Sequence, residues 1–252
     1  MESLNLILES LLDETVEVPR RTMTLFFLVD TSGSMDGKKI GAVNESIQEV
    51  LPMIRDISAT NPDAEINVAA LQFSTGTSWV YDEPKSADEF EWMDVSADGL
   101  TCLGEACEEL SGKLSKNGFM KSASGSYAPA IILLSDGEPT DDFDSGLSKL
   151  EENKWFKHAI KIAIAIGDDA DKEKLAQFTG TSEAVFTVHN IDALKKMIRI
   201  VVVTSSQVGS QSSAAGESTK QQQVIEQVQD AQKEEIKPAE PAPGTNNYDD
   251  WD

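Results

Sequence analysis

The chain has 252 residues, 40% of them hydrophobic, which is enough for one sizeable core with extensions but little for two independent domains. It carries 44 Asp and Glu against 21 Lys and Arg, a formal net charge of -23 at pH 7. A field of this sign repels phosphodiester backbones and anionic membrane surfaces, so we expect neither a nucleic-acid nor a membrane partner; metal cations and basic protein surfaces fit better.

The N-terminal residues read as a short helix. Residues 1–21 are predicted as a helical N-terminal extension that ends near Pro19. Glu9 interrupts the apolar stretch and no basic segment precedes it, so it does not resemble a signal peptide. No other stretch reaches the ~18 apolar residues of a membrane span, and we expect a cytoplasmic protein. The apolar face of this helix comprises Leu4, Ile7, Leu8, Leu11 and Leu12.

From residue 22 the pattern alternates between apolar strands and amphipathic helices. The run MTLFFLVD, starting at Met23, predicts a strand buried on both faces. The segment after it spaces its apolar residues by three and four, as an amphipathic helix does, with Pro52 expected to kink or divide it. The remaining expected strands are 66–73, 77–82 (an edge or hairpin partner), 128–136, 158–167 and 184–188, and the remaining helices 103–114, 144–153, 171–178 and 191–203.

This alternation predicts an α/β fold over residues 22–205: an open, mostly parallel, doubly wound sheet with helices on both faces. Beyond Ser205 the composition shifts to Ser, Gln, Ala, Glu and Pro, and residues 206–252 are predicted to be a disordered acidic tail. Three apolar residues in this tail would form no more than a transient turn or two of helix: Val224, Ile225 and Val228.

The segment FFLVDTSGSMDGKK, residues 26–39, has the outline of a phosphate-binding loop. A P-loop requires four residues between its glycines and a Ser or Thr after its lysine. Here three residues separate Gly33 from Gly37, and Lys38 is followed by Lys39. Two aspartates in the same segment would repel a phosphate. We therefore expect no nucleotide site and interpret the two lysines as the start of a helix.

The same segment offers oxygen ligands for a cation. Asp30, Ser32 and Ser34 alternate just past the first strand, and this spacing in an extended loop points three oxygens the same way. Mg²⁺ takes about six oxygen ligands and is often held by only one or two carboxylates. Thr101 in DGLTCLGEA and Asp136 in LLSDGEPTD could complete the set. Each of these residues alone could simply cap a helix or begin a turn; the joint pattern favours a metal site.

Together the five positions resemble the metal-ion-dependent adhesion site of von Willebrand factor A domains, over roughly residues 22 to 204. The resemblance implies that Ser32, Ser34 and Thr101 bind Mg²⁺ directly, with Mn²⁺ as the alternative metal. Asp30 and Asp136 would act largely through water or by orienting those hydroxyls. The metal would then take an exposed Asp or Glu of a protein partner, so the implied function is binding, and we do not expect an enzyme.

Within that superfamily, DTSGSM...GKKIGAVNESI and LLSDGEPTD look most like bacterial tellurium-resistance-associated TerY-like proteins. This resemblance implies an adaptor in a stress or phage-defence signalling system, with a Ser/Thr kinase and a PP2C-type phosphatase as partners. The alternatives are an adaptor of an AAA+ ATPase and a metal-dependent phosphohydrolase. The terminal YDDWD could also bind the metal site of its own or a neighbouring chain, or dock on a partner, or stay solvated.

Several further polar residues have structural interpretations. Cys102 and Cys107, five positions apart on a helix, point about 140° apart, so we expect buried free thiols. His158 and His189 have no ligand spacing. Four residues that follow Asp136 are predicted to be a solvated rim and a helix cap: Thr140, Asp141, Asp142 and Asp144.

Overall fold

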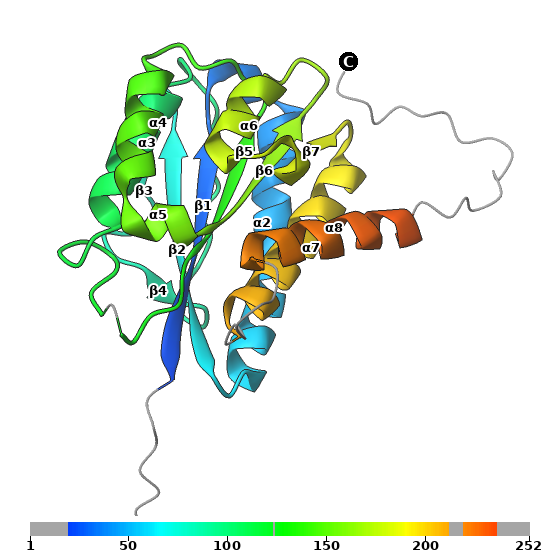
Figure 1. Ribbon diagram of the computed structural model, residues 1–252. Helices are drawn as coiled ribbons and strands as arrows, with labels where there is room; N and C mark the ends of the chain where they lie inside the picture. Colours follow the sequence, from blue (N-terminus) through cyan, green and yellow to red (C-terminus); the bar gives the residue numbers. More distant parts are fainter. Residues whose placement is uncertain (1–19, 123, 212–218, 236–252) are drawn as a thin grey trace, which may run out of the picture.

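The computed structural model describes residues 20–122, 124–211 and 219–235, and within these ranges seven strands form one sheet (Figure 1). The order is β3-β2-β1-β5-β6-β7, with β4 also paired to β2. The strands are β1 (Arg21–Asp30), β2 (Ala64–Phe73), β3 (Thr77–Trp79), β4 (Lys85–Ser86), β5 (Ala130–Ser135), β6 (Ile160–Ile166) and β7 (Val185–Val188). Only β3 and β4 run antiparallel to their neighbour within this sheet, so the prediction of an open, mostly parallel sheet is confirmed.

Helices cover both faces of this sheet, as the alternation of elements predicted. Residues of α2, α7 and α8 pack on one face, and residues of α3, α4, α5 and α6 pack on the other (Figure 1). The helices are α2 (Lys38–Thr60), α3 (Leu103–Lys113), α4 (Phe143–Glu152), α5 (Lys154–His158), α6 (Lys172–Thr179), α7 (Ile191–Gly209) and α8 (Lys220–Glu235), with short 3-10 turns η1 (Gly33–Met35) and η2 (Ser182–Ala184). The short α5 was not predicted.

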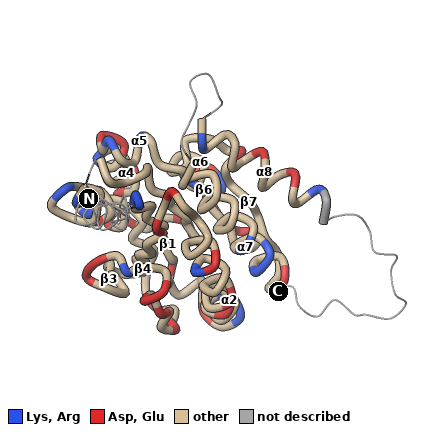
Figure 2. The backbone as a smooth tube through the Cα atoms, turned by 90° about the horizontal axis from the view of Figure 1, so that it is seen from below, with Lys and Arg blue, Asp and Glu red and all other residues tan. Residues whose placement is uncertain are grey.

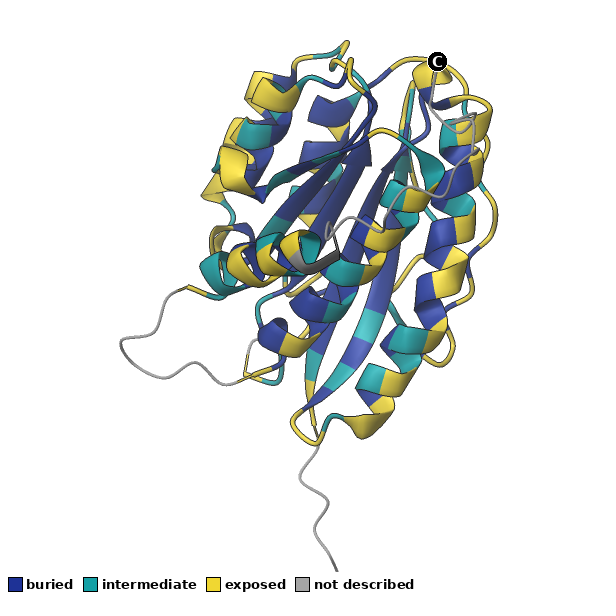
Figure 3. Ribbon diagram, turned by 90° about the vertical axis from the view of Figure 1, so that its right-hand side faces the viewer, coloured by how far each residue is buried: buried dark blue, intermediate teal, exposed yellow. Residues whose placement is uncertain are grey.

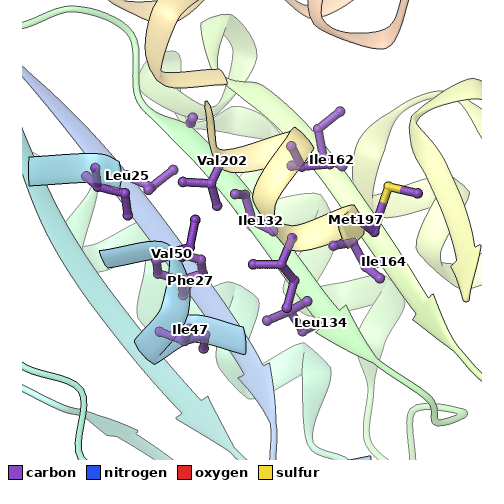
Figure 4. Close-up of a cluster of buried hydrophobic side chains, with 14 of the residues drawn as sticks. Leu25, Phe27, Ile47, Val50, Ile132, Leu134, Ile162, Ile164, Met197 and Val202 are labelled. Atoms are coloured by element: carbon purple, nitrogen blue, oxygen red, sulfur yellow. The ribbon is translucent and has the colours of Figure 1, made fainter. Parts of the chain in front are cut away.

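Strand β1 serves two cores at once. Leu25, Phe27 and Val29 belong to the core beneath α2 and α7, and Phe26 and Leu28 belong to the core beneath α3 and α4. Because successive side chains of a strand point to opposite faces, a strand covered on both sides must be apolar at every position. Figure 3 shows the strands buried and the helices exposed on their outer faces, and Figure 4 shows the first core in detail.

The helix that contains Pro52 is not divided. Of the two expectations, a kink or a division at Pro52, the division was wrong, because α2 runs without interruption from Lys38 to Thr60. Pro52 is exposed, and solvent can therefore bond the carbonyl group that its missing N–H leaves free.

The prediction that residues 206–252 are disordered was wrong for the part that the structure describes. α7 continues to Gly209, and residues 220–235 form α8, which packs on α7 and β6. Val224, Ile225 and Val228 are at most 1% exposed and join the core beneath α7. The composition of the segment is polar on average, but its three apolar residues share one helical face, and Gln, Lys and Glu are good helix formers.

Polar contacts also hold α8 on the domain. The Lys220 ammonium donates to the carbonyl oxygens of Gly209 and Gln211, at 2.6 and 2.5 Å, which satisfies groups at the end of α7. Gln221 accepts from the Lys161 N–H and donates to the Thr179 carbonyl, both at 3.1 Å. The start of α8 therefore joins the end of α7, β6 and the end of α6.

The predicted N-terminal extension, residues 1–21, lies outside the described residues except for its last two. Arg21 is the first residue of β1, so the extension ends before the position predicted. Arg20 donates to the Ser58 carbonyl at 2.6 Å. The terminal YDDWD also lies outside the described residues. Of the helices in the described ranges, none has the length and apolar character needed to cross a membrane.

Candidate metal centre

The two carboxylates of the predicted site stand at neighbouring strand ends. Asp30 is the last residue of β1, and Asp136 follows β5, which pairs directly with β1. β1 pairs with β2 on its other side, so the chain winds away from the β1–β5 boundary in opposite directions. In open α/β sheets, ligands bind at the carboxyl ends of the strands at this kind of switch point.

Hydrogen bonds join four of the five predicted site residues in one chain. The Asp30 Oδ1 atom accepts from the Ser32 N–H at 2.9 Å, the Ser32 and Ser34 hydroxyls lie 3.0 Å apart, and the Ser34 hydroxyl donates to Asp136 Oδ1 at 2.7 Å. Asp30, Ser32 and Asp136 are 0 to 2% exposed, whereas Ser34 is exposed. The group of oxygens is therefore buried at its base and open to solvent at Ser34.

Backbone contacts bring the segment before Thr101 against this loop. The Gly33 N–H donates to the Gly99 carbonyl at 3.0 Å, and the Asp98 N–H donates to the Thr31 carbonyl at 2.8 Å. Gly99 has a φ of 83°, and a Cβ added there would overlap the hydroxyl of a neighbouring threonine, so glycine alone fits the position.

Thr101 itself faces the Asp30 carboxylate across a glycine. A Cβ added to Gly137 would lie 3.2 Å from Thr101 Oγ1 and 3.5 Å from an Asp30 carboxylate oxygen. The threonine hydroxyl and the carboxylate therefore converge on one small space that the glycine leaves open. Thr101 is held there by Thr140, whose hydroxyl accepts from the Thr101 N–H at 3.1 Å and whose N–H donates to the Thr101 carbonyl at 2.9 Å.

The chemistry of these donors fits a hard divalent cation. Carboxylate and hydroxyl oxygens are the ligands that Mg²⁺ and Mn²⁺ prefer. In the described ranges no three or more His, Cys, Asp or Glu side chains gather as a metal-binding group, so a metal held here would depend on the hydroxyls.

Burial sets the electrostatics of the Asp30 carboxylate. Its burial raises its pKa; hydrogen bonds from Ser135 and Ser32 lower it, and the neighbouring Asp136 charge raises it. The Ser135 hydroxyl donates to Asp30 Oδ2 at 2.5 Å. Both Asp30 oxygens are thus satisfied by neutral groups, and the ionised carboxylate stays costly until a positive charge approaches.

Two residues at the site were missed from the sequence, Ser135 and Lys39. Lys39 does begin a helix, as predicted, but its ammonium also lies 2.5 Å from Asp136 Oδ2. Ser135 directly precedes Asp136 at the strand end, so adjacency was an available signal for it. Lys39 is separated from Asp136 by 97 positions, and no local pattern connects them.

Two of the residues that follow Asp136 cap helices, but not the same helix. Asp142 accepts from the Ser145 N–H at 3.2 Å and caps α4. The Asp141 carboxylate accepts from the N–H groups of Gly104 and Glu105, at 3.0 and 2.8 Å, at the start of α3. This contact ties the strand-end loop of Asp136 to the helix that follows Thr101.

The two cysteines are free thiols. Cys102, just before α3, is half-buried, and Cys107, within α3, is buried.

The family is shown by a match to the model of the von Willebrand factor type A domain over residues 24–200. The chain belongs to this family. Domains of this family are metal-dependent protein-interaction modules. The match runs from within β1 to the middle of α7 and includes all five predicted site positions.

Curated relatives share this domain within much longer chains. The collagen alpha-5(VI) chain of Mus musculus is 25% identical over 197 residues, covering 76% of this chain and 7% of the collagen. The collagen alpha-6(VI) chain of Mus musculus is 32% identical over 105 residues, covering 41% of this chain and 4% of the collagen. The chain thus spans less than a tenth of either relative's length, and the likeness concerns the domain.

Solved structures share the fold at low sequence identity. A von Willebrand factor type A protein from Catenulispora acidiphila has a TM-score of 0.55 and 18% identity, covering 74% of this chain and 43% of that one. Proximal thread matrix protein 1 from the mussel byssus has a TM-score of 0.57 and 16% identity, covering 75% and 48%, and that structure has a zinc-occupied adhesion-site motif.

Proposed function

We propose that this chain is a non-enzymatic protein-binding module that holds Mg²⁺, or Mn²⁺, and uses it to bind an Asp or Glu side chain of a protein partner. The observation that carries the proposal is the convergence of hydroxyls and carboxylates at the ends of β1 and β5, open to solvent at Ser34. The residues that would hold the metal are Asp30, Ser32, Ser34, Thr101 and Asp136.

The hydrogen bonds suggest a division of roles among these residues. Asp136 accepts the Ser34 hydroxyl proton, so a Ser34 lone pair is free to face a cation. Asp30 accepts from the Ser32 backbone and from Ser135, which holds the loop that carries Ser32. Ser32, Ser34 and Thr101 would therefore be direct ligands, with the carboxylates orienting them. A metal held mainly by neutral hydroxyls would supply an electrophile with a position open to an external carboxylate.

The surface around Thr101 supports a protein partner. Leu100 is 55% exposed and immediately precedes this candidate ligand. A polar groove next to the loop is lined by residues that include Thr31, Gln72, Ser96 and Asp98. A partner that reaches the metal with a carboxylate would meet an exposed apolar side chain and hydrogen-bonding groups within the same small area.

Metal binding is tested by isothermal titration of Mg²⁺ and Mn²⁺ into the full chain. Ser32→Ala combined with Ser34→Ala should weaken binding roughly 100-fold or more, because two ligands are lost, while the fold persists. Ser148→Ala combined with Ser182→Ala, two exposed serines in α4 and η2, is the matched control. Wild-type affinity in the Ser32/Ser34 variant would show that the site is wrongly assigned.

Partner binding is tested by capture on immobilised wild-type chain with Mg²⁺ or with EDTA. A partner that binds through the metal should elute with EDTA and be absent from the Ser32→Ala, Ser34→Ala variant. A charge-neutralising change at one of the partner's exposed Asp or Glu residues should abolish its capture. Capture that survives both EDTA and the double variant would contradict the proposal.

The cellular context that we propose is a cytoplasmic, TerY-like stress or phage-defence system with a Ser/Thr kinase and a PP2C-type phosphatase. The motifs DTSGSM and LLSDGEPTD support it. An AAA+ ATPase is the alternative partner, and co-purification from the native host distinguishes the two. A metal-dependent phosphohydrolase would instead turn over phosphoesters with added Mg²⁺ and lose this activity in Asp30→Ala.

A further inference from the structure

Lys39 places a fixed positive charge beside the candidate metal ligands. It is the second residue of α2, its side chain is 13% exposed, and its ammonium lies 2.5 Å from Asp136 Oδ2. The other oxygen of the same carboxylate accepts from the Ser34 hydroxyl. The ammonium is thus one carboxylate away from a proposed ligand.

The position of Lys39 conflicts with the local preference of its helix. The first turn of α2 contains Lys38 and Lys39 and no acidic residue, and no side chain caps its N-terminus. Cations are disfavoured at the positive end of the helix dipole. The contact with Asp136 therefore overrides a local electrostatic cost, and such conflicts are expected where function requires them.

We propose that Lys39 is a built-in cation of the metal site that opposes binding of the divalent metal and strengthens binding of the partner's carboxylate. This inference rests on the proposed function. Asp30 and Asp136 carry two negative charges when ionised, which a divalent cation would balance. With Lys39 the loaded site has a net charge of one positive unit, and an incoming carboxylate then neutralises it instead of adding an uncompensated negative charge.

A second carboxylate near Lys39 does not cancel this effect. Asp169 Oδ1 lies 3.8 Å from the ammonium, but its side chain is 73% exposed. Water and salt screen an exposed carboxylate strongly, whereas the Asp136 side chain is fully buried. The field of Lys39 is therefore felt most strongly on the buried side, towards the proposed ligands.

The competing explanation is that Lys39 only fastens the start of α2 to the end of β5. Under that explanation, removing the charge lowers the stability of the fold but leaves the affinities for metal and carboxylate unchanged. Under our proposal the two affinities change in opposite directions. This pair of opposite changes is the signature to measure.

The experiment uses the full chain and two neutral variants, Lys39→Gln and Lys39→Met. Glutamine can still donate a hydrogen bond to Asp136, so it removes the charge with the least disturbance of the contact. Lys38→Met, which removes the same charge from the exposed neighbour, is the matched control, and Lys39→Arg keeps the charge. Thermal unfolding of each variant is recorded first.

Two probes are then applied. Mn²⁺ affinity is measured by electron paramagnetic resonance, and acetate binding to the Mn²⁺-loaded chain is followed by water-proton relaxation as acetate displaces metal-bound water. Lys39→Gln and Lys39→Met should bind Mn²⁺ roughly tenfold more tightly, the order expected for the loss of one nearby like charge, and should bind acetate several-fold more weakly. Lys38→Met and Lys39→Arg should match the wild type in both.

The role of Lys39 is overturned if Lys39→Gln leaves the Mn²⁺ and acetate affinities unchanged, or if both affinities change in the same direction. If the wild-type chain itself binds no Mn²⁺, the proposed function fails, and this result is distinct from failure of the inference. If Lys38→Met has the same effect as Lys39→Gln, the change reflects net charge alone and the inference is again overturned.

Discussion

The apolar layer beneath α2 and α7 and the polar edge at the ends of β1 and β5 use the same two strands in opposite ways. In the layer, Phe27 and Ile132 are fully buried among other hydrocarbon side chains (Figure 4). At the edge, a few residues along the same strands, Asp30 and Asp136 are equally buried but carry charge.

This difference separates the part of the domain that stabilises the fold from the part that is kept for a ligand. Hydrocarbon burial is favourable in itself, at about 1.5–3 kcal/mol for a large side chain. A buried carboxylate is unfavourable unless it is paired. Asp136 is paired with Lys39, whereas Asp30 accepts from neutral groups, so the cost that a further cation can relieve lies with Asp30. Acidic positions are spread along the chain in Figure 2, but Asp30 and Asp136 are the two carboxylates that lie fully buried among the described residues.

The largest effect should come from the apolar layer. Phe27→Ala should lower the free energy of unfolding by about 3–5 kcal/mol, because it removes a fully buried ring and leaves a cavity between two elements. Urea unfolding followed by circular dichroism measures it. Ser78→Ala on the edge strand β3 is the control, expected within about 0.5 kcal/mol of wild type. Equal losses for the two would contradict the assignment of the core.

The next effect tests whether α8 belongs to the same layer. Val228→Ala should cost about 1–2 kcal/mol, since two methyl groups leave a buried site. Gln227→Ala, at an exposed position on the same helix, should change stability little. Hydrogen exchange of α8 amides should also accelerate in Val228→Ala. Identical behaviour of the two variants would mean that α8 does not pack on α7 in solution.

A smaller effect on the free energy of unfolding, of opposite sign, should come from the polar ends of β1 and β5. Asp30→Asn should stabilise the metal-free protein by about 1 kcal/mol at neutral pH, because it removes a buried charge but keeps a group that can accept from Ser32. The pKa of Asp30 is raised on folding, so the folded state holds its proton more tightly than the unfolded state does. Stability of the wild type should therefore fall as the pH rises from the unfolded value through the raised pKa, and the variant should not show this loss.

Added Mg²⁺ sharpens that test. Mg²⁺ should raise the melting temperature of the wild type by mass action, because binding adds about 2.7 kcal/mol to the free energy of unfolding at 100 times the dissociation constant. Asp30→Asn should not respond to Mg²⁺. Differential scanning calorimetry at several pH values measures both effects. A variant that is less stable than the metal-free wild type at every pH would show that Asp30 is not under electrostatic strain.

The smallest effect, on partner binding, should come from the exposed residue beside Thr101. Leu100→Ser should weaken binding of the EDTA-elutable partner by a few-fold, about 1 kcal/mol, and leave the Mn²⁺ affinity unchanged, because the side chain is exposed beside Thr101 but offers no metal ligand. Met93→Ser, also 55% exposed, controls for the loss of an apolar surface residue. An equal loss of partner affinity in both variants would argue against a contact centred on the metal.

Much of the fold could be predicted because its signals are local. A strand covered on both faces must be apolar throughout, and MTLFFLVD has that pattern. The Asp-x-Ser-x-Ser spacing likewise lies within five residues, so the oxygens of Asp30, Ser32 and Ser34 could be grouped before any contact was known. Thr101 and Asp136 could be added as candidates because one precedes an expected helix and the other ends an expected buried strand, and the resemblance to a family then supported the joint pattern.

Only the tertiary structure decided which distant groups meet the site and which polar segment folds. The contacts of Lys39 with Asp136 and of Ser135 with Asp30 join positions 97 and 105 apart, and no periodicity encodes them. Composition alone did not predict α8, because a short polar helix is marginally stable by itself and becomes stable only when its apolar face packs on another surface. The sequence determined the sheet and the candidate ligands through local chemistry, whereas packing decided the charge balance of the site and the extent of the domain.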